Sequence, residues 1–209
     1  MEEGKYKIAV NGRWTLEDLY VFPRAYEQVY FLMYSLLPQE EDLAVERIQH
    51  AYAAFPWRGG YSAVNFYNQL KYVLPKNQRP AIVSIQYASP GWIELALLVG
   101  VAVSVERLIK SIANSIDRAN QVYHNIHTGL QQRKLLRIET KRKELQLKKE
   151  EREYVDDSLK QMAQLLGFKN LAEINARTGN PYITLKILLS FYRRLRTLAD
   201  YQKRGKTNL

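Results

Sequence analysis

The sequence of 209 residues contains no cysteine and only three histidines. The lack of cysteine excludes disulfide bonds, thiol nucleophiles and thiolate metal sites, and it suits a reducing compartment, so a cytoplasmic location is expected. His124 and His127 lie one helical turn apart, but the nearest carboxylates in sequence, Asp117 and Glu139, are about two turns or more away. Two surface histidines on a polar helix are therefore favoured over a metal site.

Sequence signatures of the common enzyme mechanisms are also missing. No serine lies in a nucleophile elbow, and no glycine-rich loop carries the lysine and serine that would hold phosphates. A site assembled from distant segments would escape such a search. The sequence accordingly predicts a non-enzymatic protein that needs no cofactor, no metal and no small-molecule substrate.

Long hydrophobic runs are scarce. The chain starts with Met-Glu-Glu-Gly-Lys, which lacks the features of a secretion signal. The most apolar run covers residues 92–105, but a membrane-spanning helix needs about 20 apolar residues, and Glu94 lies near the start of this run. Small residues at Ala96, Gly100 and Ser104 suit close helix packing in protein or in lipid. Burial in protein is favoured, and membrane insertion is the alternative.

Acidic residues are scarce at the C-terminal end. Residues 158–209 hold ten basic and two acidic side chains and so carry most of the net charge of +10. Such asymmetry indicates a nucleic acid, an anionic membrane surface or an acidic protein as a partner. The helix dipole explains some of the cations but not all of them. The candidate contacts to phosphate are Arg193, Arg194, Arg196, Lys203, Arg204 and Lys206.

The residues that are present predict two short strands near the N-terminus. Residues 6–10 alternate in polarity and end at Asn11-Gly12, and residues 80–87 are rich in β-branched side chains. The two strands are expected to pair with each other, or one of them to lie on an edge that pairs with another subunit. Residues 1–89 are thus predicted to form a small α+β domain.

Helices are predicted between these strands. The spacing of Thr15 and Asp18 is that of a capping box, and Pro23 is expected to kink or restart the helix that follows. That helix carries an aromatic stripe, for which a place in the core is favoured over base stacking. Two more helices are expected over about 39–53 and 62–74. Before the second of these, the residues that would form an anion-binding nest are Arg58, Gly59 and Gly60, although a helix-entry loop is favoured there.

The middle of the chain predicts one long helix. Apolar residues recur at three- and four-residue steps after Trp92, which is heptad-like spacing and asks for a partner helix. A continuous helix from Trp92 to Leu166 would extend about 110 Å, with Gly129 as a hinge; an antiparallel hairpin is the less favoured alternative. The predicted oligomer interface consists of Leu97, Val101, Ile109, Ile112, Ile116, Tyr123 and Ile126.

Three further helices are predicted over 157–166, 170–176 and 182–202. The segment Ala163–Phe168 partly matches the first helix and turn of helix-turn-helix modules, but a glycine cap at Gly167 between two ordinary helices is favoured.

The predicted fold is mainly α with a small α+β N-terminal domain (1–89), a long central helix that is a possible coiled coil (90–157) and a basic C-terminal three-helix module (158–209). The predicted function is that of an oligomerising interaction or scaffold protein. The alternatives are a nucleic-acid binder that uses the C-terminal cations and a membrane-associated effector that inserts residues 92–105.

Overall fold

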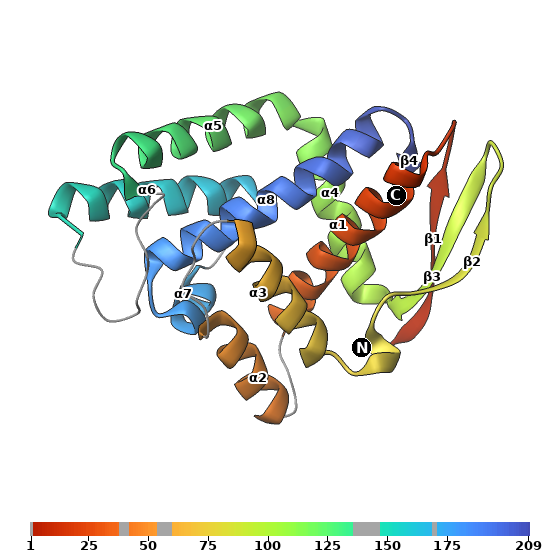
Figure 1. Ribbon diagram of the computed structural model, residues 1–209, viewed down its shortest axis with the longest axis horizontal. Coiled ribbons are helices and arrows are strands. Elements are labelled where there is room, and N and C mark those ends of the chain that lie inside the picture. Colours follow the sequence, from red (N-terminus) through yellow and green to blue (C-terminus); the bar gives the residue numbers. More distant parts are fainter. Residues whose placement is uncertain (1, 38–41, 54–59, 136–146, 169–170) are drawn as a thin grey trace. The chain divides into compact units, whose positions relative to one another are not determined.

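The computed structural model describes residues 2–37, 42–53, 60–135, 147–168 and 171–209. Within these stretches the protein is mostly helical, with eight α-helices and one four-stranded antiparallel sheet (Figure 1). The predicted class, mainly helical with a small sheet near the N-terminus, is confirmed.

Contacts divide the chain into two units, each assembled from separated stretches of sequence. Unit 1 consists of Met1–Leu37, Lys71–Ile116 and Arg193–Leu209, and unit 2 consists of Pro38–Leu70 and Asp117–Tyr192. The sheet lies in unit 1.

The sheet has the strand order β2-β3-β1-β4. Its strands are β1 (Glu3–Val10), β2 (Ala81–Gln86), β3 (Gly91–Leu98) and β4 (Thr207–Asn208). The predicted strands at 6–10 and 80–87 are confirmed as β1 and β2. They do not pair with each other, because β3 lies between them and pairs with both. This order leaves β2 at one edge of the sheet (Figure 1).

The prediction of a helix that begins at Trp92 is wrong, because the first part of the apolar run forms β3. All eight residues of β3 pair with β1, from Gly91 opposite Val10 to Leu98 opposite Glu3. Alternate side chains of β3 are buried. The strand is thus specified by pairing with a segment about 90 residues earlier, which the periodicity of a short apolar run does not reveal. A helix, α4 (Val99–Asn114), begins only after β3.

Helix α1 (Leu16–Ser35) covers one face of the sheet together with α4 (Figure 1). The predicted capping box is confirmed, and α1 continues through Pro23 rather than restarting there. The aromatic stripe lies in the core, as favoured. Its central residue, Tyr30, accepts a hydrogen bond from the Leu98 backbone N–H (2.9 Å) and donates one to the Gln78 carbonyl (3.0 Å), so it ties α1 to the end of β3.

The helices that supply unit 2 are α2 (Asp42–Ala53), α3 (Gly60–Val73), α5 (Ile116–Gln132), α6 (Lys149–Leu165), α7 (Ala172–Thr178) and α8 (Pro181–Lys203). The last residues of α3 and of α8 belong to unit 1. The prediction of a continuous helix up to Leu166 is wrong, because α4 ends at Asn114 and α5 ends at Gln132.

Gly129 is not a hinge. It lies inside α5, where the ring of Tyr154 on α6 packs against it, and a Cβ atom at this position would lie 1.8 Å from the Tyr154 hydroxyl. That hydroxyl donates to the Ile126 carbonyl (3.2 Å), and the Arg133 guanidinium lies 3.9 Å from the ring centre. The glycine is therefore explained by close approach of two helices.

A glycine ends α6, as the favoured interpretation of the Ala163–Phe168 segment predicted. Gly167 has φ of +71°, and the Phe168 N–H donates to the Ala163 carbonyl (2.9 Å), which is a Schellman motif.

The seven residues predicted as an oligomer interface are all buried within the single chain. The apolar seam from Leu97 to Ile126 therefore already has partners inside the fold. A contact between two copies of the chain would therefore have to use other surfaces.

Candidate functional site

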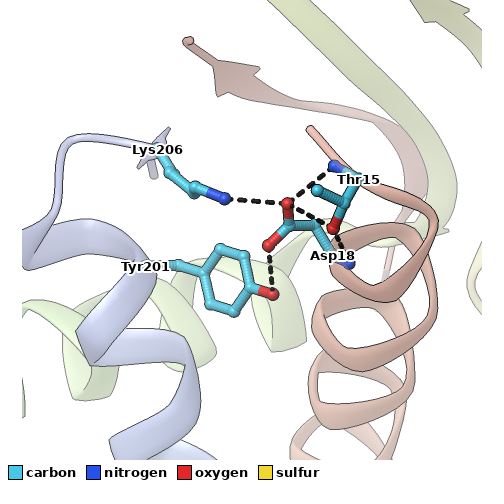
Figure 2. Close-up of polar contacts among 4 residues, drawn as sticks. All are labelled: Thr15, Asp18, Tyr201 and Lys206. Atoms are coloured by element: carbon cyan, nitrogen blue, oxygen red, sulfur yellow. Dashed lines mark hydrogen bonds and ion pairs between the residues drawn. The ribbon is translucent and has the colours of Figure 1, made fainter. Parts of the chain in front are cut away.

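A polar cluster joins the start of α1 to the end of α8. We call it the Asp18 clasp, formed by Thr15, Asp18, Tyr201 and Lys206 (Figure 2). On α1, the Thr15 backbone N–H donates to Asp18 Oδ2 (2.7 Å) and the Asp18 N–H donates to Thr15 Oγ1 (3.1 Å). This reciprocal pair is the capping box, and it fixes the orientation of the carboxylate.

The other half of the clasp depends on the way α8 ends. Gly205 has φ of +67°, and the Lys206 N–H donates to the Tyr201 carbonyl (3.0 Å), so a second Schellman motif reverses the chain. After this turn β4 pairs with β1. The reversal brings Lys206 Nζ to 2.7 Å from Asp18 Oδ2, while the Tyr201 hydroxyl donates to Asp18 Oδ1 (2.9 Å).

The electrostatics of the clasp favour one protonation state. The Lys206 ammonium holds the pKa of Asp18 well below its usual range, and the bonds from Thr15 and Tyr201 act in the same direction against the effect of burial. Burial, with the Asp18 carboxylate as a second cause, raises the pKa of Tyr201 to about 12. Asp18 is therefore ionised and Tyr201 neutral at neutral pH, which describes a structural tie rather than an acid–base pair.

A hollow of about 190 Å³ lies beside the clasp, and we call it the α8 hollow. Three of the six predicted phosphate contacts line it, namely Arg196, Arg204 and Lys206, but so do the carboxylates of Asp18 and Asp200. The local charge is close to balanced, so the cationic surplus of the C-terminal sequence does not become a uniformly positive site here.

The other predicted cations lie outside this hollow. Arg194 donates from Nε to the side-chain oxygen of Gln28, and Arg193 and Lys203 are exposed on α8. The anion nest predicted before α3 lies at Arg58 and Gly59, outside the described residues, and Gly60 is the first residue of α3.

Neither a metal site nor a membrane span is found in the described stretches. Their His, Asp and Glu side chains form no group of three or more that would hold a metal ion. His124 and His127 instead lie near the ring of Tyr123, at 5.7 and 5.9 Å between ring centres. Across the same stretches, every helix is too short or too polar to cross a membrane.

The second candidate site is the exposed strand β2. All six of its residues are exposed, none is charged, and no other strand of the described residues pairs with its outer edge. Large apolar side chains are half exposed along it: Ile82 is 57% exposed, Val83 45% and Ile85 50%, and Tyr87 just after the strand is 66% exposed. Sequence reasoning located this strand, but β-branched composition is typical of buried strands and does not show that α1 leaves it uncovered.

A second hollow, of about 300 Å³, lies between α1 and the helix-facing side of β2, and we call it the β2 hollow. Its walls are mainly apolar and include Tyr20, Pro80 and Ile82. Two charged residues line it. Glu27 is bonded to Lys71 (3.0 Å), whereas Arg24 lies over the ring of Tyr20 (5.7 Å) and has no ion pair within the described part of the chain.

No protein-family model, curated protein or solved structure matches this chain.

Proposed function

We propose that this protein is a non-enzymatic, self-associating interaction protein, and that two copies pair through the outer edge of β2. The observation that carries the proposal is an uncharged edge strand with three half-exposed aliphatic side chains. Edge strands that stay single in solution are normally protected by charged side chains, above all lysine, by a proline or a bulge, or by a helix or loop that covers them. β2 has only a bulge near Val83 and a proline at its start.

The size of the exposed surface supports the same conclusion. Besides β2, unit 1 exposes apolar side chains at the start of α1, including Leu19 and Tyr20, and Tyr20 and Ile82 line the same hollow. Together these side chains expose on the order of 500 Å² per chain, which is at the upper end for the largest apolar patch of a monomer and approaches the area that one partner buries in a stable complex.

A second copy of this chain suits β2 better than a charged partner segment. A charged strand would find no counter-charge on β2, whereas an identical strand offers the same backbone edge and equally apolar side chains. Pairing would join two four-stranded sheets into one and would satisfy the outward backbone groups of both edges.

Light scattering on the purified chain tests this proposal. At tens of micromolar the wild type is expected to have twice the chain mass of 24.4 kDa. Ile85→Lys is expected to give a monomer, because it places a charge in the paired edge. Leu43→Lys is the matched control, since Leu43 on α2 is 55% exposed and lies in unit 2. A wild-type monomer at this concentration would overturn the proposal.

Nucleic-acid binding through the C-terminal cations is less favoured. The carboxylates of Asp18 and Asp200 share a hollow with three of these cations, and Arg194 is engaged by Gln28. An anisotropy titration with single- and double-stranded DNA and RNA at low salt distinguishes the two functions, because phosphate contacts would give steeply salt-dependent affinity.

A further inference from the structure

The pairing of β2 with β3 determines which side chains of β2 face the helices. Directly opposite residues on neighbouring strands share a face of the sheet. Ile82 is opposite Leu95 and Ile85 is opposite Ile93, and both of these β3 residues are buried on the helix-facing side. A bulge between Ile82 and Ser84 adds one residue, so two isoleucines three positions apart share this face.

The alternation extends this assignment to the residues that flank β2. Gln86, the last residue of β2, is opposite Trp92 and faces away from the helices. One further step of strand alternation would assign Tyr87, just after β2, to the helix-facing side with Ile85. Before the strand, Ala81 is opposite Ala96 and faces away, which places Pro80 on the helix-facing side. Pro80 indeed lines the β2 hollow together with Ile82.

A two-fold axis between Val83 and Ser84 pairs β2 with itself over its full length. In this antiparallel register Ile82 lies opposite Ile85 of the second copy, and Pro80 lies opposite Tyr87 of the second copy. Ile82 and Ile85 are both on the helix-facing side, and the alternation assigns Pro80 and Tyr87 to the same side, so the faces of the two sheets agree. Shifting the register by one residue would place Ile82 opposite Ser84 or Gln86, whose side chains face the other way.

We propose that the β2 hollow is the receptor site for Tyr87 of a second copy of this chain, held by antiparallel β2–β2 pairing with Ile82 opposite Ile85. This inference rests on the proposed self-association and specifies its geometry. By symmetry each copy inserts one tyrosine and receives one, so the interface contains two identical aromatic anchors.

The shape and charge of the β2 hollow suit a tyrosine. Its volume of about 300 Å³ is much larger than the ~30 Å³ share of one water molecule, and its walls are mainly apolar. Arg24 lines it and already lies over one aromatic ring, that of Tyr20. A second ring in the hollow would give this guanidinium another aromatic face. Tyr87 is 66% exposed in the single chain, so it is available for insertion.

Cysteine cross-linking tests the register, because the chain has no cysteine of its own. An oxidised mixture of Ile82→Cys and Ile85→Cys chains is expected to form a disulfide-linked heterodimer. Neither variant is expected to cross-link with itself, because identical positions lie three residues apart along the strands, about 10 Å, beyond the reach of a disulfide. Leu43→Cys mixed with Ile82→Cys is the control and is expected to stay uncrosslinked.

Sedimentation equilibrium of tyrosine variants tests the receptor site. Tyr87→Ala is expected to raise the dimer dissociation constant at least tenfold, and Tyr87→Phe is expected to raise it less, because the ring is retained. Tyr72→Ala is the matched control, since Tyr72 is 70% exposed in the same unit but lies outside β2 and its hollow. It is expected to leave the constant unchanged.

The outcomes separate this inference from the proposed function. A monomeric wild type overturns both. A dimer that Ile85→Lys disrupts keeps β2 pairing, but a missing cross-link between the Ile82→Cys and Ile85→Cys chains then overturns the register. An unchanged dissociation constant for Tyr87→Ala likewise overturns the receptor site. The expected cross-link together with the selective effect of Tyr87→Ala supports the inference.

Discussion

Replacing Asp18 by asparagine isolates the charge of the Asp18 clasp, because the side chain keeps its size. The substitution removes the ion pair with Lys206 and the charge in the bonds from Tyr201 and the Thr15 N–H. The residue is only 8% exposed, so water compensates little for these losses. Asparagine still supplies one oxygen that can accept from the helix N-terminus.

The expected cost is about 2 kcal/mol of unfolding free energy at pH 7. Hydrogen bonds to a charged group contribute roughly 1.5–3 kcal/mol, and the asparagine retains part of the cap. For a chain of this size the thermal midpoint should fall by about 4–8 °C. Tyr201→Phe removes only one of the bonds and leaves the ring among its aromatic neighbours, so about 1 kcal/mol is expected.

The pH dependence gives the sharper test. The folded state holds the pKa of Asp18 below its ordinary value of 3.8, so the folded state binds fewer protons than the unfolded state at acidic pH. The stability that the carboxylate contributes is therefore present above about pH 4 and is lost as the pH falls further. Asp18→Asn lacks this component.

Urea unfolding followed by tryptophan fluorescence measures the effect, since Trp14 and Trp92 both lie in unit 1. The gap in unfolding free energy between wild type and Asp18→Asn should be constant from pH 5 to 7 and should shrink below pH 4. A gap that is equally large at pH 3, or that is below 0.5 kcal/mol at pH 7, would refute the reasoning.

Two further predictions concern unit 2. Gly129→Ala should lower the unfolding free energy by about 1 kcal/mol, because the new Cβ would displace the Tyr154 hydroxyl from its position 1.8 Å away, and the lost Tyr154 contacts outweigh the better helix propensity of alanine; thermal melting checks this. When Tyr154→Ala is present, Gly129→Ala should instead stabilise the protein by about 0.5–1 kcal/mol, the helix-propensity gain alone. Burial lowers the pKa of Lys186 from 10.5 to about 8, so between about pH 8 and 10 the unfolded state binds more protons than the folded state. The unfolding free energy of the wild type, measured by urea titration, should therefore rise with pH over this range. Lys186→Met should not show this rise.

The features predicted correctly are those that a few neighbouring residues determine. Thr15 and Asp18 form a capping box because both partners lie within one turn, and Gly167 ends α6 because only its own backbone has to adopt positive φ. The alternation of polarity before Asn11-Gly12 predicts strand β1. In each case the residues that determine the feature lie within about ten positions of one another, so the local sequence is enough to predict it.

The features missed depend on partners far away in the chain. The sequence predicts Lys206 as a phosphate contact, because its actual partner, Asp18, lies 188 residues away along the chain. The β2 hollow exists because α1 does not cover the β2 edge, which composition cannot show. The seam from Leu97 to Ile126 asks for a partner helix whether that helix comes from the same chain or from another, and the fold supplies it internally.

Glu94 offers a direct test of the strand that replaced the predicted helix. In a helix beginning at Trp92 its carboxylate would interact with the helix dipole and with nothing near the N-terminus of the chain. In β3 it lies opposite Lys7 on the outer face of the sheet, and its oxygens lie 3.6 Å from Lys7 Nζ and 3.7 Å from Lys5 Nζ. Only the strand predicts an energetic coupling between residues 7 and 94.

A double-mutant cycle with Lys7→Ala and Glu94→Gln measures this coupling. Lys7 is well exposed, so solvent screens the pair and about 0.3–0.5 kcal/mol is expected at low salt, falling towards zero at 1 M salt. The same cycle with Lys110→Ala in place of Lys7→Ala is the control, because Lys110 pairs with Glu106 on α4 instead. Coupling for Lys7 and none for Lys110 is the signature of the β1–β3 register, whereas equal values for both lysines would contradict it.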